Sequence, residues 1–299
     1  ASQPITRSGH VSEFNQQSIT VECTDNAHLA ATLFTPKSQL KGAILMGPAT
    51  GIKRQFYSSF ASYLANNGYG VLTFDNRGIG ESLVGSIANS EASLQCWGEQ
   101  DMPAALNALQ QAFPDTNYHL IGHSAGGQLV GLMPNAHQLS SIYNYACSSG
   151  CLRNMHMPYF AKAQFFMNIF IPLSNLLLGY TKSQLMGMGE PLPKAAAQQW
   201  RQWCNGQGYI KTAFDTTVHS HYYDELEIPS MWVNSTDDDI ANNDNVADMI
   251  SVYSKMKAQT LTLNPKDHNL SEIGHMRFFS RKSQSLWQHT LDWLGQHGT

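Results

Sequence analysis

Short apolar runs alternate along the chain with segments whose apolar residues recur at helical spacing. Phe56, Phe60 and Leu64, for example, follow the i, i+4, i+8 pattern of an amphipathic helix. This alternation predicts an α/β fold with a mostly parallel central sheet flanked by helices. The first two runs flank a turn-rich stretch and predict an antiparallel hairpin. The expected strands cover residues 18–23, 30–34, 42–47, 71–75, 118–122, 140–147, 230–234 and 260–264, and the expected helices lie near 56–64, 97–113, 127–133, 246–256 and 287–294.

The alternation breaks between about residues 150 and 223, where Met, Phe, Leu, Trp and Pro are frequent but no strand–helix rhythm is visible. We therefore expect a core made of residues 1–149 and 224–299, with residues 150–223 inserted as a mainly helical cap or lid. In open α/β sheets the ligand site lies at the carboxyl edge of the strands. The insertion is expected to cover that edge.

Composition and charge narrow the classes of partner. The net charge of −4 and the absence of any basic run indicate neither nucleic acid nor an anionic membrane as a partner. The most apolar stretch, 160–180, contains Lys162 and Pro172 and predicts no integral membrane span. The first ten residues lack the apolar region of a signal peptide, which favours a cytoplasmic location. A leader removed upstream is the alternative.

The five cysteines are too few and too scattered for a disulfide framework, so buried thiols are expected. Cys147 and Cys151 have a spacing that suits a metal, but no second Cys/His pair accompanies them. The sequence contains no dinucleotide-binding fingerprint either. We expect no metal and no organic cofactor.

The sequence Gly122-His123-Ser124-Ala125-Gly126 joins an expected strand to an expected helix. In that context a G-x-S-x-G string is typical of a nucleophile on a sharp turn, where glycines are needed because side chains would clash. The turn strains the serine backbone and exposes its Oγ above the sheet edge. We therefore predict Ser124 as the nucleophile and the Ala125 N–H as one donor of an oxyanion hole.

A second string, DNRGIGES at 75–82, follows the strand at 71–75. Together with GHSAGG it resembles the α/β-hydrolase fold superfamily over the whole chain except the insertion. The loop GPATG at 47–51 is similar to one in a subgroup of predicted bacterial α/β-hydrolases of the serine hydrolase type. The resemblance implies the α/β-hydrolase fold, a lid and serine hydrolase chemistry, but no particular substrate. Asp75 and Arg77 are interpreted as structural residues that hold their loop.

A serine hydroxyl at its ordinary pKa is a poor nucleophile and needs a base, which in turn needs an orienting carboxylate. The resemblance implies the chain order Ser, acid, His, with the acid after a late strand. The family pattern there is an acid, any residue, then Ile or Val, and it selects Asp238 as the acid. Asp237 and Asp239 are alternatives, because three carboxylates are adjacent.

The base is expected in the loop after the last strand, where two of the twelve histidines qualify. A Gly-His pair followed by aromatic residues matches the family's site and selects His275, with His268 as the alternative. The second oxyanion donor is expected from the loop after the third strand. It would be the backbone N–H of Ala49 or Thr50, since Pro48 has none.

These residues predict hydrolysis of a carboxylic ester or thioester through a Ser-His-Asp triad and an acyl-enzyme intermediate. The many apolar residues of the insertion favour an apolar acyl group. The alternatives are an acyltransferase that uses the same triad, an amidase, and a non-catalytic binding protein on the same fold. The expected partner is a small-molecule ester or thioester, while the natural substrate and the oligomeric state are left open.

Overall fold

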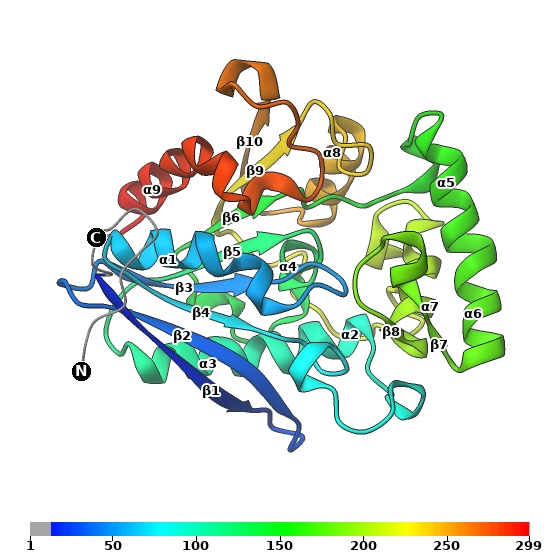
Figure 1. Cartoon of the computed structure of the whole chain (residues 1–299), viewed down its shortest axis with the longest axis horizontal. Helices are drawn as coiled ribbons and strands as arrows, with labels where there is room; N and C mark the ends of the chain where they lie inside the picture. Colours follow the sequence, from blue (N-terminus) through cyan, green and yellow to red (C-terminus); the bar gives the residue numbers. More distant parts are fainter. Residues whose placement is uncertain (1–12, 299) are drawn as a thin grey trace.

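The computed structural model describes residues 13–298, which form one large central sheet with helices around it (Figure 1). The eight strands run in the order β1-β2-β4-β3-β5-β6-β9-β10. Strand β2 is antiparallel to β1 and β4, and the other neighbouring pairs are parallel. The strands are β1 Phe14–Glu22, β2 His28–Pro36, β3 Gly42–Gly47, β4 Tyr69–Phe74, β5 Tyr118–His123, β6 Ser141–Tyr145, β9 Pro229–Ser235 and β10 Lys257–Leu263. The predicted fold class and the opening hairpin are confirmed.

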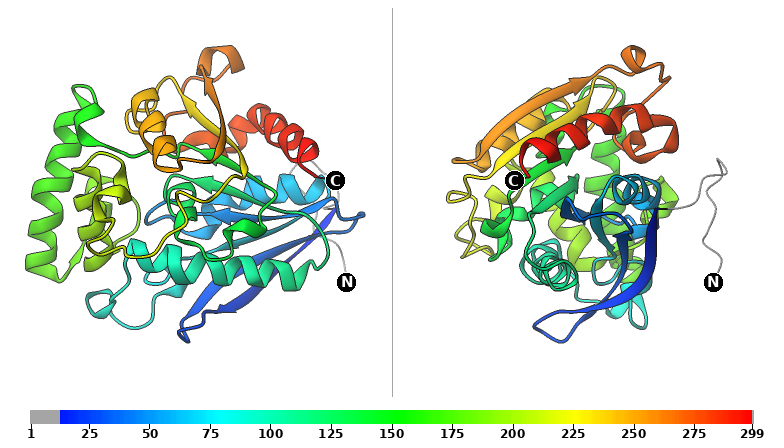
Figure 2. Two further views of the ribbon diagram at one scale, coloured as in Figure 1. Left: turned by 180° about the vertical axis from the view of Figure 1, so that it is seen from behind. Right: turned by 90° about the vertical axis from the view of Figure 1, so that its left-hand side faces the viewer.

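Helices cover both faces of the sheet (Figure 2). On one face, α1 (Ser58–Asn66) packs against α9 (Trp287–Gln296), and the ring centroids of Phe60 and Trp287 lie 5.2 Å apart. The opposite face is covered by α3 (Met102–Ala112). Outside residues 150–223 the chain also contains α2 Leu94–Cys96, the π-helical η4 Trp97–Asp101 and α8 Asn243–Val252. The N-terminal residues that favoured a cytoplasmic location lie outside the described part of the chain.

The helix expected after Ser124 is shorter than its sequence pattern indicates. Helix α4 (Ala125–Gln128) makes one turn and is followed by a 3-10 turn over Val130–Leu132. The hydroxyls of Tyr223 and Tyr253 donate to the carbonyl oxygens of the last two residues of α4, at 2.5 and 2.6 Å. Because these carbonyls are already satisfied by side chains from a distant part of the chain, the α-helical ladder ends there.

Between β6 and β9 the chain forms a mainly helical segment beyond the carboxyl ends of the parallel strands, on the right in Figure 1. Three helical elements follow one another without a break from residue 159 to 178, and a pair of two-residue strands adds a feature that the sequence did not predict. None of the helices in residues 13–298 has the length and apolar character needed to cross a bilayer. Besides short 3-10 turns, the elements are α5 Tyr159–Phe165, the π-helical η8 Phe166–Phe170, α6 Ile171–Leu178, β7 Tyr180–Thr181, β8 Leu192–Pro193 and α7 Lys194–Cys204.

Candidate active site

Ser124 occupies the tight turn between β5 and α4. Its φ of 50° and ψ of −109° lie in a region that residues with side chains rarely adopt. The turn presses against β3, so a Cβ on Gly126 would lie 2.0 Å from the carbonyl oxygen of Gly47. A Cβ on Gly122 would lie 2.6 Å from the amide nitrogen of Gly127. Glycines at 122 and 126 therefore allow the strained turn that the sequence pattern indicated, at the carboxyl edge of the sheet.

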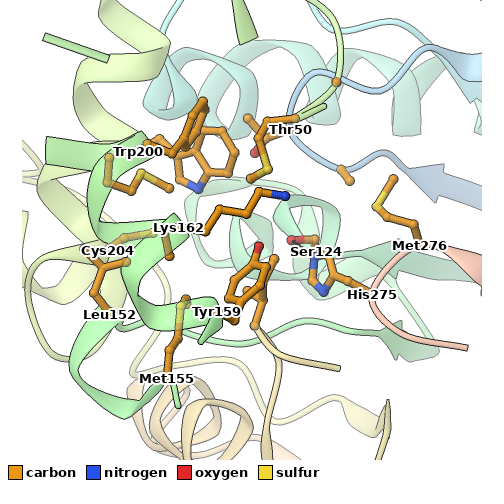
Figure 3. A pocket seen from close by; sticks show the side chains of 18 of the residues that line it. Thr50, Ser124, Leu152, Met155, Tyr159, Lys162, Trp200, Cys204, His275 and Met276 are labelled. Carbon is orange, nitrogen blue, oxygen red and sulfur yellow. Dashed lines mark hydrogen bonds between the residues drawn. The ribbon is translucent and has the colours of Figure 1, made fainter. Parts of the chain in front are cut away.

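His275 belongs to the loop after β10, and its ring lies beside Ser124 (Figure 3). The Nε2 atom is 3.3 Å from Ser124 Oγ, and Nδ1 is 2.9 Å from Asp238 Oδ2. Because an ionised carboxylate can only accept, Nδ1 carries the hydrogen and Nε2 presents its lone pair to the serine hydroxyl. The structure thus brings the three residues of the predicted triad into one hydrogen-bonded line.

The carboxylate of Asp238 is fully buried and fully hydrogen-bonded. Its second oxygen accepts the backbone N–H groups of Ile240 at 2.8 Å and Ala241 at 2.9 Å. Burial alone would raise the pKa of Asp238, but the attraction of His275 and these hydrogen bonds outweigh it and lower the pKa below its usual value. The group is therefore an anion at neutral pH, held in place from both sides.

The alternative acid and base residues lie in other surroundings. Asp237 accepts two consecutive backbone N–H groups immediately before the histidine, the second from Gly274 at 2.8 Å. Asp239 is exposed, and its partial burial and the repulsion of its two acidic neighbours raise its pKa. The ring of His268 lies 6.3 Å from that of His289, centroid to centroid. Only one of the three adjacent carboxylates bonds the imidazole, and a second one fixes the backbone that carries it.

A buried chain of hydrogen bonds connects the loop after β3 to the backbone of His275. The Ala49 N–H donates to Tyr57 Oη at 2.9 Å, Tyr57 Oη lies 2.8 Å from His123 Nδ1, and His123 Nε2 lies 2.8 Å from the His275 carbonyl oxygen. Burial and the nearby His275 lower the pKa of His123 to about 3, so its ring is neutral at physiological pH. Because the carbonyl can only accept, His123 donates through Nε2 and accepts the Tyr57 hydrogen at Nδ1.

The loop after β4 is held by two ion-paired arginines. Asp75 accepts the backbone N–H of Arg54 at 2.7 Å and its Nη1 at 2.6 Å. Arg77 donates through Nε to Asp101 at 2.7 Å and through Nη1 to Asp25 at 2.6 Å. These contacts join the loop to β1, β2 and the α3 region and agree with the structural interpretation of Asp75 and Arg77.

A cavity of about 240 Å³ opens beside Ser124 and His275. Its wall is mostly apolar, and no Asp or Glu of the described residues lines it. Figure 3 shows the amino group of Lys162 reaching across the cavity toward Ser124, with Trp200 on the far wall. Thirteen of the 21 lining residues come from the segment 150–223. The cavity is lined by Ala49, Thr50, Ile52, Ser124, Gln128, Gly150, Leu152, Met155, Tyr159, Lys162, Ala163, Phe166, Met167, Gly187, Met188, Gly189, Trp200, Cys204, Ile240, His275 and Met276.

The cysteines form no disulfide. Cys96 is partly exposed, whereas the other four thiols, including Cys147 and Cys151, are buried. Burial and the nearby Asp101 raise the pKa of both Cys23 and Cys96 to about 12. Across residues 13–298, no group of three or more His, Cys, Asp or Glu side chains is placed to hold a metal ion.

Comparison with solved structures shows similarity over nearly the whole chain. A soluble variant of monoglyceride lipase from Saccharomyces cerevisiae, in complex with a substrate analog, is 14% identical with a TM-score of 0.69, and the match covers 100% of both chains. A thermophilic esterase from Thermogutta terrifontis is 15% identical with a TM-score of 0.57, covering 95% of this chain and 100% of that one. An esterase from Pyrococcus furiosus is 11% identical with a TM-score of 0.60, covering 98% and 96%. At these identities the similarity establishes the fold.

The family is established by sequence. A family model described as "Serine aminopeptidase, S33" matches residues 53–270, a span that includes Ser124 and Asp238 and ends shortly before His275. No curated protein matches the chain. The chain therefore belongs to the serine aminopeptidase S33 family and is a serine hydrolase of the α/β-hydrolase fold.

Proposed function

We propose that this serine hydrolase cleaves carboxylic esters or thioesters through an acyl-enzyme formed on Ser124. The observation that carries the proposal is the line from Ser124 Oγ through His275 to Asp238, with distances of 3.3 and 2.9 Å. The strained turn, the buried carboxylate and the adjoining apolar cavity support it. A hydroxyl, an imidazole in the matching tautomer and a fixed anion are the parts that acyl transfer requires.

In the proposed reaction Ser124 Oγ attacks the carbonyl carbon while its proton passes to His275 Nε2. The tetrahedral intermediate collapses, the bond to the leaving alcohol or thiol breaks, and Nε2 returns the proton to the leaving group. Water then attacks the acyl-enzyme, gives one proton to Nε2, and releases the acid as that proton moves to Ser124 Oγ. Asp238 holds the tautomer and stabilises the imidazolium in both halves.

For the oxyanion hole we infer the N–H groups of Ala125 and Thr50. Ala125 is the first residue of α4, where helix N–H groups have no intrahelical acceptor. The sequence left Ala49 and Thr50 as alternatives, but the Ala49 N–H already donates to Tyr57 Oη. Thr50 lies next to it and lines the cavity. A donor of this kind stabilises the transition state by about 3–4 kcal/mol.

The lining of the cavity favours binding of an uncharged or anionic acyl group over a peptide with a free amino terminus. Binding an α-ammonium in a partly dry site needs a carboxylate, and the described lining contains none. The lining instead holds the cation of Lys162 among apolar side chains such as Phe166 and Met167. This favours an apolar acyl chain and disfavours aminopeptidase activity.

We also propose that residues 150–223 act as a lid over the site, with residues 1–149 and 224–299 as the core. The supporting observation is that this segment supplies most of the cavity wall while the sheet loops supply the reacting groups. The proposed lid would exclude water from the acyl-enzyme and set which acyl chains fit.

The test is a panel of p-nitrophenyl esters of increasing acyl length, with thioester, amide and aminoacyl-anilide substrates alongside. We expect turnover of apolar esters that disappears in Ser124→Ala and persists in Ser149→Ala, a buried serine that precedes the cavity-lining Gly150. Faster cleavage of the aminoacyl anilides would contradict the ester assignment. An absence of turnover on every substrate would favour a binding protein, and product release that depends on an added alcohol or thiol would favour an acyltransferase.

A further inference from the structure

The outward side of the helix from residue 159 to 178 is almost devoid of polar groups beyond Lys162, which is exposed. Between residues 163 and 178, every exposed residue is large and apolar. Water-facing positions of a helix in a globular protein are normally polar, and consecutive exposed apolar residues are kept only where something covers them. We call these six residues the outer helix patch: Phe165, Ile169, Leu173, Leu176, Leu177 and Leu178, which are between 45% and 79% exposed.

The patch lies on the back of the wall that faces the site. Tyr159, Ala163, Phe166 and Met167, from the same helical stretch, line the cavity beside Ser124. Figure 1 shows this stretch, α5 to α6, at the outermost end of the molecule, with no other element beyond it. The core of the protein therefore leaves these leucines uncovered.

The charge of the chain is divided unevenly between this segment and the rest. Residues 150–223 contain six of the 18 Lys and Arg residues but only two of the 22 Asp and Glu residues. The segment thus carries a net charge of +4, although the whole chain carries −4. Of the two carboxylates, Glu190 is already paired with Lys53 at 3.3 Å. The overall charge, from which the sequence indicated no anionic membrane, conceals this local excess of positive charge.

Two of the lysines are attached to the end of α6 that carries the leucines. The Lys182 backbone N–H donates to Ser174 Oγ at 3.0 Å, and the Lys194 carbonyl accepts from Asn175 Nδ2 at 3.3 Å. Within residues 13–298, neither lysine has a carboxylate at ion-pair distance. An exposed apolar stripe on a segment of net charge +4, with unpaired lysines among its charges, matches the chemistry of an anionic bilayer surface.

We propose that the outer helix patch docks this protein on an anionic lipid bilayer. The helix lies in the plane of the interface, with the leucines among the upper acyl chains and Lys182 and Lys194 against the headgroup phosphates. A second copy of the chain fits less well, because two segments of net charge +4 would face each other. Docking is a property of the outer surface and does not depend on the ester chemistry, so its test measures binding.

The test is flotation of the full chain with vesicles of phosphatidylcholine alone and with added phosphatidylglycerol. We expect binding to the anionic vesicles that weakens steeply as salt is raised. Leu176→Ser with Leu177→Ser should weaken binding about tenfold, and Lys182→Glu with Lys194→Glu at least about tenfold. Lys257→Glu with Lys266→Glu, exposed lysines on the β10 side, is the matched control and should bind like the wild type.

Turnover of a short, water-soluble ester separates this proposal from the proposed function. The leucine double variant should retain that turnover, which would show that it is folded, and should lose binding to the vesicles. Wild-type protein that stays unbound at low salt would overturn docking, and so would equal flotation of both lysine pairs. Concentration-dependent dimers that the leucine double variant abolishes, without vesicle binding, would overturn it in favour of self-association.

Discussion

The two sides of the site are built in opposite ways. On the sheet side the polar groups that support the triad are held by hydrogen bonds, as Asp238 is by two backbone N–H groups and His123 is by Tyr57 and the His275 carbonyl. On the side of residues 150–223 the wall consists mainly of apolar side chains such as Phe166. Under the proposed function, the sheet loops would fix the chemistry with little tolerance, whereas the helical segment would select which acyl groups enter and could vary more.

The largest expected effects come from the reacting groups themselves. Ser124→Ala and His275→Ala should each lower kcat by about 10⁶-fold, because the two residues act as a unit. Urea unfolding should show that the variants remain folded. His268→Ala is the matched control, and steady-state kinetics should find it close to wild type. An active His275→Ala with an inactive His268→Ala would reverse the assignment of the base.

The next largest effect should distinguish the two adjacent carboxylates, Asp238 and Asp237. Asp238→Asn should lower kcat by about 10⁴-fold, because the amide favours the wrong tautomer of His275. Asp237→Asn removes the anion that two backbone N–H groups before the histidine bind, and it should lower kcat only about tenfold. Steady-state rates of the two variants measure the difference. Near-normal turnover in Asp238→Asn beside an inactive Asp237→Asn would move the acid by one position.

The buried His123 should make stability depend on pH. Its pKa is lowered from 6.5 to about 3 in the folded protein. Between these two pH values His123 is protonated in the unfolded chain but neutral in the folded protein. The contribution of His123 to the free energy of unfolding is fully present above pH 6.5 and is lost as the pH falls toward 3. At pH 5 the loss is on the order of 2 kcal/mol. Urea unfolding at pH 7 and pH 5 measures it. His123→Gln should show a smaller loss over the same interval, and an equal loss would contradict the account.

Removing the hydroxyl of Tyr57 should disturb the loop of the proposed oxyanion hole without changing the reacting groups. Tyr57→Phe breaks the link from Ala49 to His123 and leaves two buried polar groups unpaired, which costs about 1–3 kcal/mol each. We expect kcat to fall about tenfold, with KM little changed, because the displaced donors act on the transition state. Tyr63→Phe, on the half-buried side of α1, is the control and should leave both constants near wild type. A change in KM alone would argue against a role in the oxyanion loop.

The smallest effects should come from the apolar wall. Phe166→Ala enlarges the cavity and should raise kcat/KM for longer acyl chains relative to short ones by several-fold. This is below the roughly 10-fold or more that one methylene contributes in a tightly fitted pocket, because the enlarged cavity fits the longer chain loosely. The ester panel measures that ratio. A loss as large as that of Asp238→Asn would mean that the helical side also fixes the chemistry.

The sheet and the strained serine turn could be predicted from the sequence because both depend on local patterns. Apolar runs marked the strands, and the glycines around Ser124 marked a turn that no other residue fits. The short α4 could not be predicted, because Tyr223 and Tyr253 end it from far along the chain. The link from Tyr57 to His123 spans 66 residues and has no local signature.

The roles of the site residues remain predictions for a related reason. The sequence ordered Ser124, Asp238 and His275 through a family resemblance, and the fold places them in contact. It could not choose between Ala49 and Thr50, since that choice depends on a hydroxyl from another element. The exposure of the leucines in the outer helix patch could not be predicted either, because sequence alone does not distinguish exposed apolar residues of a helix from buried ones.

Reaction of the native chain with a fluorophosphonate, followed by peptide mapping, tests the central claim most directly. Such a reagent modifies only a serine hydroxyl that a neighbouring base activates. We predict a single adduct on Ser124 in the folded protein, lost in urea and in His275→Ala. A native protein that stays unmodified, or an adduct on a different serine, would contradict acyl chemistry at this site.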